Sequence, residues 1–239
     1  MPRAIDDPIQ RTGEDAVINA AARALARTPG PAGLAVLLRL ANGPPRGGVV
    51  AALAGRRRLD ALPYYIKALE EDITRKEAEA AIRMLGPAAR PALLHAAAAP
   101  SGAPESESGK RRRRSALGLY ADLGPGADRD QAELLRLIRD DDPEVSVTAC
   151  DIWLGMGARP DTAVSRLVEL LGQGSWVLDA RIEDCLLKHA ALAEAIVGDA
   201  LKAYAGALDI ASPQVQRKTD ALLRLLHRLG GRLGRMAGS

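Results

Sequence analysis

Residues 76–94 decide the fold, and they read KEAEAAIRMLGPAARPALL. The first ten residues of this stretch are rich in Ala, Glu, Lys, Leu and Met, which are strong helix formers. Gly86 can adopt the left-handed conformation that closes a helix, and Pro87 prevents the helix from continuing. A second apolar segment follows, with Pro91 near its start. The stretch therefore predicts two short helices joined by a tight turn.

The same pattern occurs twice more along the chain. The three copies occupy residues 76–94, 114–138 and 142–171. The glycines that close their first helices are Gly86, Gly124 and Gly157, which lie 38 and 33 residues apart. A recurrence of this length is typical of repeat proteins built from one helical unit at a time.

Within each copy, the second segment carries apolar residues at spacings of three and four. They include Leu134, Leu135 and Ile138 in one copy, and Leu167, Leu170 and Leu171 in the next. Such spacing places side chains on one face of a helix, and we expect that face to be buried. Truncation of a buried leucine such as Leu135 to Ala should then cost about 2–5 kcal/mol. The acidic stretch at 140–144 predicts a capped helix start.

Residues 85–93 (LGPAARPAL) and 141–145 (DDPEV) resemble the HEAT-repeat family, in the short form found in bacterial proteins and in lyase-type HEAT repeats. The resemblance covers residues 72–172. It implies a right-handed α-solenoid of stacked helix pairs. HEAT arrays serve many roles, so the resemblance implies an architecture and not an activity.

Outside this centre the sequence remains helical. Further pairs are predicted at 14–27 with 32–41, at 48–57 with 62–71, and at 176–192 with 192–207, followed by a closing helix at 214–229. We therefore expect an all-α fold of about six short HEAT-like pairs that form a single domain over residues 1–239. A flexible insertion is expected at 100–109, and a frayed tail from about residue 230.

Composition agrees with a helical fold and narrows the function. Phe is absent, aromatic residues total 3%, and the formal net charge is +3. Cys150 and Cys185 have no metal-binding or disulfide spacing, so we expect two small core residues. No signal-like or membrane-spanning apolar run occurs, which predicts a cytoplasmic, bacterial protein. No cofactor or metal is expected.

The residues that could support catalysis are few and dispersed. His95, His189 and His227 lie in separate segments without metal-ligand spacing. A second resemblance favours an enzyme. A base-excision glycosylase family with HEAT-like helices uses Trp, Asp and Arg on its concave face. Trp176, Asp179 and Arg181 match that inventory. The main expectation is a protein that is not an enzyme, and the alternative is a nucleic-acid-binding solenoid, including one with DNA glycosylase-like activity.

Residues 110–114, which read KRRRR, form the most concentrated charge in the chain. Five cations at a helix start oppose the helix dipole and repel one another. Three interpretations stay open. The run is a solvated turn, or carboxylates such as Glu105 and Glu107 or the adjacent repeat neutralise it, or it binds an external anion on an acidic protein or nucleic acid.

A second basic group lies near the end of the chain. It comprises Arg217, Lys218, Arg224, Arg228, Arg232 and Arg235. Their spacing puts Arg217, Arg224 and Arg228 on one helix face, where cations at a helix C-terminus are stabilising. Because acidic stretches lie elsewhere, the charge is segregated, which favours docking or self-association.

These features favour a non-catalytic scaffold or adaptor that binds a protein partner, acidic in character, through the solenoid surface. The predicted partner-binding residues are Lys110, Arg111, Arg112, Arg113, Arg114, Tyr64, Tyr65, Arg136, Arg166 and Trp176. The tyrosines and Trp176 would act as anchors, and the cations would form ion pairs with acidic groups of the partner.

Overall fold

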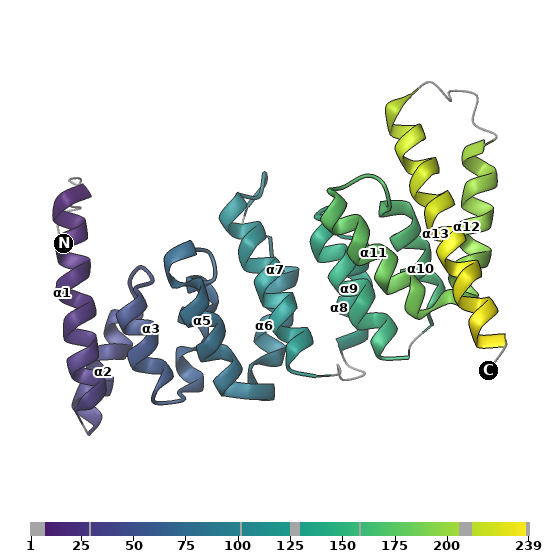
Figure 1. Cartoon of the computed structure of the whole chain (residues 1–239). Coiled ribbons are helices and arrows are strands. Elements are labelled where there is room, and N and C mark those ends of the chain that lie inside the picture. Colours follow the sequence, from purple (N-terminus) through teal and green to yellow (C-terminus); the bar gives the residue numbers. More distant parts are fainter. Residues whose placement is uncertain are drawn as a thin grey trace. The chain divides into compact units, whose positions relative to one another are not determined.

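The computed structural model describes residues 8–28, 30–100, 102–124, 130–157, 159–205 and 212–237. Every regular element within these ranges is a helix, and none of them is a strand (Figure 1). The all-α prediction is therefore confirmed. The chain divides into two compact units, Met1–Gly124 and Pro125–Ser239.

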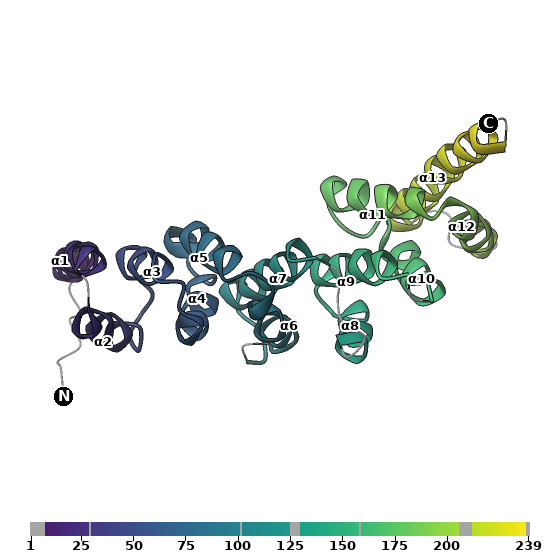
Figure 2. The same cartoon turned by 90° about the horizontal axis from the view of Figure 1, so that it is seen from below.

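Unit 1 is built from two rows of helices. Its elements are α1 (Pro8–Arg27), α2 (Pro31–Leu40), α3 (Gly47–Ala54), η1 (Leu59–Ala61), α4 (Leu62–Ala68), α5 (Asp72–Leu85), η2 (Gly86–Ala89), α6 (Arg90–Ala98) and α7 (Glu107–Asp122). Helices α1, α3, α5 and α7 contact one another in succession, and α2, α4 and α6 lie in a second row (Figure 2). The short α4 contacts α3, α5, α6 and α7, so it is enclosed on several sides.

Unit 2 continues with helices of similar length and a long last helix. Its elements are α8 (Gln131–Ile138), α9 (Pro143–Gly155), α10 (Asp161–Leu170), α11 (Trp176–Lys188), α12 (Ala190–Ala205) and α13 (Pro213–Ala237). Helix α9 contacts α8, α10 and α11, while α12 packs along α13 and also contacts α10. Each helix thus packs against its neighbour in sequence, and α9 with α11, α10 with α12 and α11 with α13 also pack against each other.

The helix ends form where the sequence predicts them. Gly86, Gly124 and Gly157 all have positive φ, of 66°, 98° and 70°, as closing glycines require. The carboxylate of Asp142 caps α9 by accepting hydrogen bonds from the backbone N–H groups of Glu144 (2.9 Å) and Val145 (3.2 Å). The prediction of a capped start in the acidic stretch is confirmed.

Two boundaries differ from the expectation. Helix α7 already begins at Glu107, because the Ser106 hydroxyl accepts a hydrogen bond from the Gly109 N–H at 3.1 Å and starts the helix there. Residues 107–109, expected in the loop, are therefore helical. In the C-terminal region of the chain, α13 extends to Ala237, beyond the predicted end of the closing helix at residue 229.

One predicted core residue is misplaced. Leu134 and Ile138 are buried as expected, but Leu135 is 38% exposed. The buried face of α8 passes through Leu134, Leu137 and Ile138. Residues one apart on a helix lie about 100° apart, so Leu135 points away from that face. Truncating Leu135 to Ala should therefore cost well under the 2–5 kcal/mol expected of a buried leucine.

Candidate binding surfaces

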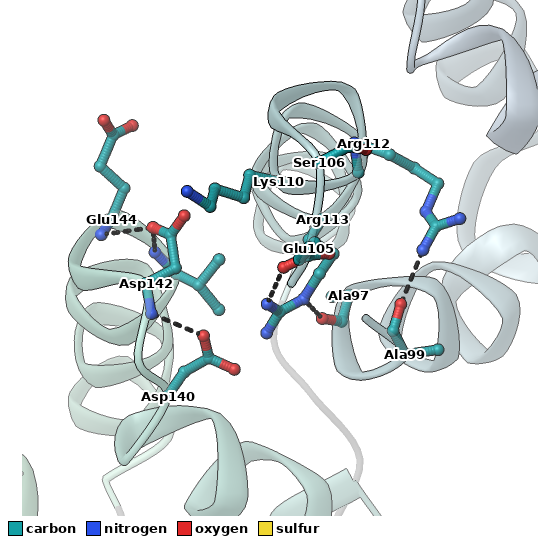
Figure 3. A network of polar contacts seen from close by, with 12 residues as sticks. Ala97, Ala99, Glu105, Ser106, Lys110, Arg112, Arg113, Asp140, Asp142 and Glu144 are labelled. Atoms are coloured by element: carbon teal, nitrogen blue, oxygen red, sulfur yellow. Dashed lines mark hydrogen bonds and ion pairs between the residues drawn. The ribbon is translucent and has the colours of Figure 1, made fainter. Parts of the chain in front are cut away.

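The basic run is part of helix α7, and its fourth member is an internal residue. Arg113 is only 4% exposed. Its Nε donates to the carbonyl oxygen of Ala97 at 2.6 Å, and its Nη1 pairs with Glu105 at 2.8 Å (Figure 3). Arg113 therefore joins α7 to the end of α6 and to the loop between them.

The other cations of the run also have partners within unit 1. The ion pairs are Lys110 with Glu107 (2.7 Å), Arg111 with Asp72 (2.6 Å) and Arg112 with Glu70 (2.9 Å). Arg112 also donates to the carbonyl oxygen of Ala99 at 2.6 Å. The hydrogen bond from Arg111 lowers the pKa of Asp72. Arg114 is half-buried and takes part in interactions of its own.

The interpretation that carboxylates and adjacent helices neutralise the run is thus confirmed for Lys110, Arg111, Arg112 and Arg113. The solvated-turn interpretation is wrong, because the segment is helical and Arg113 is buried. Asp72 and Glu70 offset the charges of Arg111 and Arg112, which weakens the attraction of the run for an external anion.

Tyr64 and Tyr65 are core residues, so the prediction that they anchor a partner is wrong. They are buried because α4 is packed against four other helices. The Tyr64 hydroxyl accepts from the Arg46 N–H at 2.9 Å and donates to the Pro44 carbonyl at 3.4 Å. The Tyr65 hydroxyl has no hydrogen-bond partner among the described residues, and burial raises its pKa.

Three members of the basic group near the end of the chain join α13 to α10 and α11 within unit 2. Arg224 pairs with the buried carboxylate of Glu183 at 3.1 Å, and Arg228 pairs with the same carboxylate. Lys218 is buried and donates to the carbonyl oxygens of Val168 and, at 2.7 Å, Glu169 at the end of α10. Burial lowers the pKa of Lys218 to about 8. The side chains of Arg232 and Arg235 lie outside the described part.

Trp176 and Asp179 have different surroundings, although both lie in the first turn of α11. The Trp176 side chain is 81% exposed. Asp179 instead accepts a hydrogen bond from the Gly172 N–H at 2.9 Å. Gly172 has a φ of 79°, and a Cβ there would lie 3.0 Å from the Lys218 Cα, so only glycine fits this turn. Arg181 binds the Thr148 hydroxyl at 3.1 Å.

Asp179 and Arg181 are therefore used in structural contacts, and this weighs against the glycosylase-like alternative. Trp176 remains an exposed aromatic residue suited to a partner contact. The other tryptophan, Trp153, is buried, and its Nε1 donates to the Arg159 carbonyl at 2.8 Å.

Among the residues that the structure describes, a surface hollow is found in each unit. In unit 1 the α2–α4 hollow, of about 540 Å³, is lined by Ala35, Leu38, Arg39, Ala41, Asn42, Asp60, Ala61, Pro63 and Tyr64. In unit 2 the α8–α10 hollow, of about 490 Å³, is lined by Ile138, Arg139, Thr162, Ser165, Arg166 and Glu169. Both volumes fall in the range of about 300–1,000 Å³ typical of ligand sites.

Two predicted site residues line a hollow, the largely buried Tyr64 in unit 1 and Arg166 in unit 2, and Arg166 is held in a fixed position. Its Nε donates to the Ser146 hydroxyl at 3.2 Å, its Nη2 to the Asp140 carbonyl at 3.2 Å, and its Nη1 pairs with Glu169 at 3.1 Å. Arg136, also predicted, is exposed on α8 and pairs with Glu133 at 3.5 Å outside the hollow.

Sequence reasoning missed Arg139, Thr162 and Ser165. The signal was present in α10, where Thr162, Ser165, Arg166 and Glu169 recur at helical spacing opposite the apolar face. It identifies an exposed polar face, and only the structure shows that α8 adds Arg139 beside it.

The described residues contain no group of three or more His, Cys, Asp or Glu arranged to hold a metal ion. Cys150 and Cys185 are buried, as predicted, and burial raises the pKa of each thiol to about 12. Such thiols are poor nucleophiles near neutral pH. Among the helices that the structure describes, none has both the length and the apolar character needed to cross a membrane.

Comparison of this chain with protein-family models, with curated proteins and with solved structures finds no match. The function is therefore inferred from the residues and surfaces described above.

Proposed function

We propose that this chain is a right-handed α-solenoid of about six short HEAT-like helix pairs that acts as a non-catalytic scaffold for a protein partner. The two rows of helices in unit 1 and the glycines that close successive first helices support the architecture. A solenoid has a thin core and a broad surface, which suits binding better than enclosing a reaction.

One observation supports the binding role most directly. In both units the hollow lies between second helices of successive repeats, α2 with α4 and α8 with α10. Second helices line the concave surface of HEAT arrays, where an extended partner is held. The repetition of a hollow at the same kind of place, with different chemistry in each, favours recognition of several partner side chains.

The test compares matched substitutions to glutamate in the full chain. Ala35→Glu introduces a charge at the α2–α4 hollow, while Ala80→Glu introduces the same charge on the exposed face of the first helix α5. In unit 2, Ser165→Glu alters the α8–α10 hollow, and Ala180→Glu alters exposed α11. Each variant is immobilised, and proteins from cells of the source organism that bind at physiological salt are quantified.

We expect a protein that is retained by wild type and by Ala80→Glu and Ala180→Glu, but lost by a hollow variant. Loss in the first-helix variants alone would place the interface elsewhere. Retention that disappears after nuclease treatment and falls steeply with salt would instead favour the nucleic-acid-binding alternative.

A further inference from the structure

The α8–α10 hollow has a lining whose charge and hydrogen-bonding groups suit one class of ligand. Its lining includes two guanidinium groups, from Arg139 and Arg166, two hydroxyl groups, from Thr162 and Ser165, and one carboxylate, from Glu169. Two positive charges and one negative charge leave a net charge of +1, from 2 − 1. The lining thus offers mainly donors and a modest positive charge.

Hydrogen bonds fix the orientation of the Arg166 guanidinium, which suits the binding of a planar anion. Ser146, the Asp140 carbonyl and Glu169 each take one of its nitrogen atoms, which fixes the plane of the guanidinium before any ligand arrives. A guanidinium has five N–H donors, so N–H groups remain beyond these three bonds. Because the group is already ordered, binding costs less conformational entropy than at a free surface arginine.

Arg139 supplies a second cation from another helix. It lies at the end of α8, is exposed, and has no ion pair or side-chain hydrogen bond among the residues described. Ile138 beside it is buried, so the exposed part of the lining is polar. A ligand in the hollow therefore meets guanidinium and hydroxyl groups contributed by two helices.

We propose that the α8–α10 hollow binds the carboxylate side chains of an acidic segment in a protein partner. This inference rests on the scaffold function proposed above and names the chemistry of the partner. A carboxylate matches the hollow, because its two oxygens suit the guanidinium geometry and can accept hydrogen bonds from the Thr162 and Ser165 hydroxyls. Glu169 repels a doubly charged ligand more than a singly charged one, so the hollow favours a carboxylate over a phosphate dianion.

The test uses the full chain and a synthetic acetylated peptide of four glutamates around one leucine. Binding is followed through the NMR signals of the arginine Nε–Hε groups. We expect the signals of Arg139 and Arg166 to shift and saturate. Arg139→Gln should weaken binding about tenfold, the loss of one charge-assisted contact. Glu169→Gln should strengthen it, because a repelling carboxylate is removed.

Arg136→Gln is the matched control, because Arg136 lies on the same helix but outside the hollow. Equal weakening by Arg136→Gln and Arg139→Gln, or no shift at millimolar peptide, would overturn the proposal. So would tighter binding of inorganic phosphate or of a single-stranded DNA oligonucleotide at the same signals. If Ser165→Glu releases the captured partner while Arg139→Gln retains it, the scaffold function stands and the acidic ligand is wrong.

Discussion

Two arginine–glutamate clusters, one in each unit, place a charge inside a helical protein in opposite ways. In unit 1, Arg113 and Glu105 form a pair in which both side chains are nearly buried, at 5% and 11% exposure. In unit 2, Glu183 is buried at 7%, but its two partners Arg224 and Arg228 remain 56% and 42% exposed. Both members of the first pair are thus shielded from solvent, whereas the two cations of the second cluster are exposed to it.

The difference predicts how each cluster responds to damage. A buried pair that loses one member leaves a charge that neither water nor protein compensates, which is strongly destabilising. A buried carboxylate with two half-exposed cations can lose one and keep the other. The burial of the partners, rather than the number of ion pairs, should therefore decide the effect of a substitution.

The largest effect is expected for Arg113→Ala. It removes the hydrogen bond to Ala97 and the pair with Glu105, and should destabilise the protein by about 3–5 kcal/mol in urea unfolding. The double variant Arg113→Ala with Glu105→Ala should recover part of that loss, because the nearly buried carboxylate that paired with Arg113 is also gone. A loss that matches an exposed pair would show that water reaches this site freely.

The second cluster should show redundancy. Arg224→Ala and Arg228→Ala should each cost under about 1 kcal/mol, since the remaining arginine still pairs with Glu183. Together they should cost about 3 kcal/mol, because the buried carboxylate is then alone. Urea unfolding of both single variants and the double variant measures the coupling. Simple additivity would mean that each arginine acts independently of the other.

Lys218 extends the comparison to a buried cation that is held by backbone carbonyl groups. Burial lowers its pKa from the usual 10.5 to about 8, although nearby Asp179 and Glu169 act in the opposite direction. Because the folded pKa is depressed, the unfolded state binds more protons between the two values. The contribution of Lys218 to stability should therefore rise with pH across that interval.

The expected size of this rise is on the order of 2 kcal/mol between about pH 7 and pH 10.5. It is measured as the difference in unfolding free energy between wild type and Lys218→Met at each pH, which cancels the buried thiols and tyrosines that titrate in the same range. A difference that stays flat with pH would mean that Lys218 remains solvated in the folded state.

Much of the helical fold could be predicted from the sequence, because glycine and proline act locally. Gly86 and Gly157 close helices whatever surrounds them, and Asp142 caps its own helix. The choice between Leu134 and Leu135 could not be made, since both fit an apolar pattern and only packing against α9 selects the buried one.

The candidate site was harder to predict, because its residues depend on contacts between segments. From the sequence, Tyr64 and Tyr65 fit surface anchors and core residues equally well. Only the packing of α4 against its neighbours shows that they are core residues. A run of five cations likewise does not reveal which one faces inward. Helix geometry turns each residue about 100° from the last, and the packing of α6 selects Arg113.

The smallest effect is expected within that same run, for Arg111→Ala. Arg111 pairs with Asp72 at 2.6 Å, but the Asp72 side chain is 65% exposed and water replaces the lost contact. The substitution also removes a cation from the first turns of α7, where the helix dipole disfavours it. These two effects oppose each other, so the urea midpoint should not change measurably, at low or at high salt. A decrease in the urea midpoint as large as that caused by Arg113→Ala would show that the five cations act as one unit. Burial of the ion pair would then not explain the difference between Arg111 and Arg113 within α7.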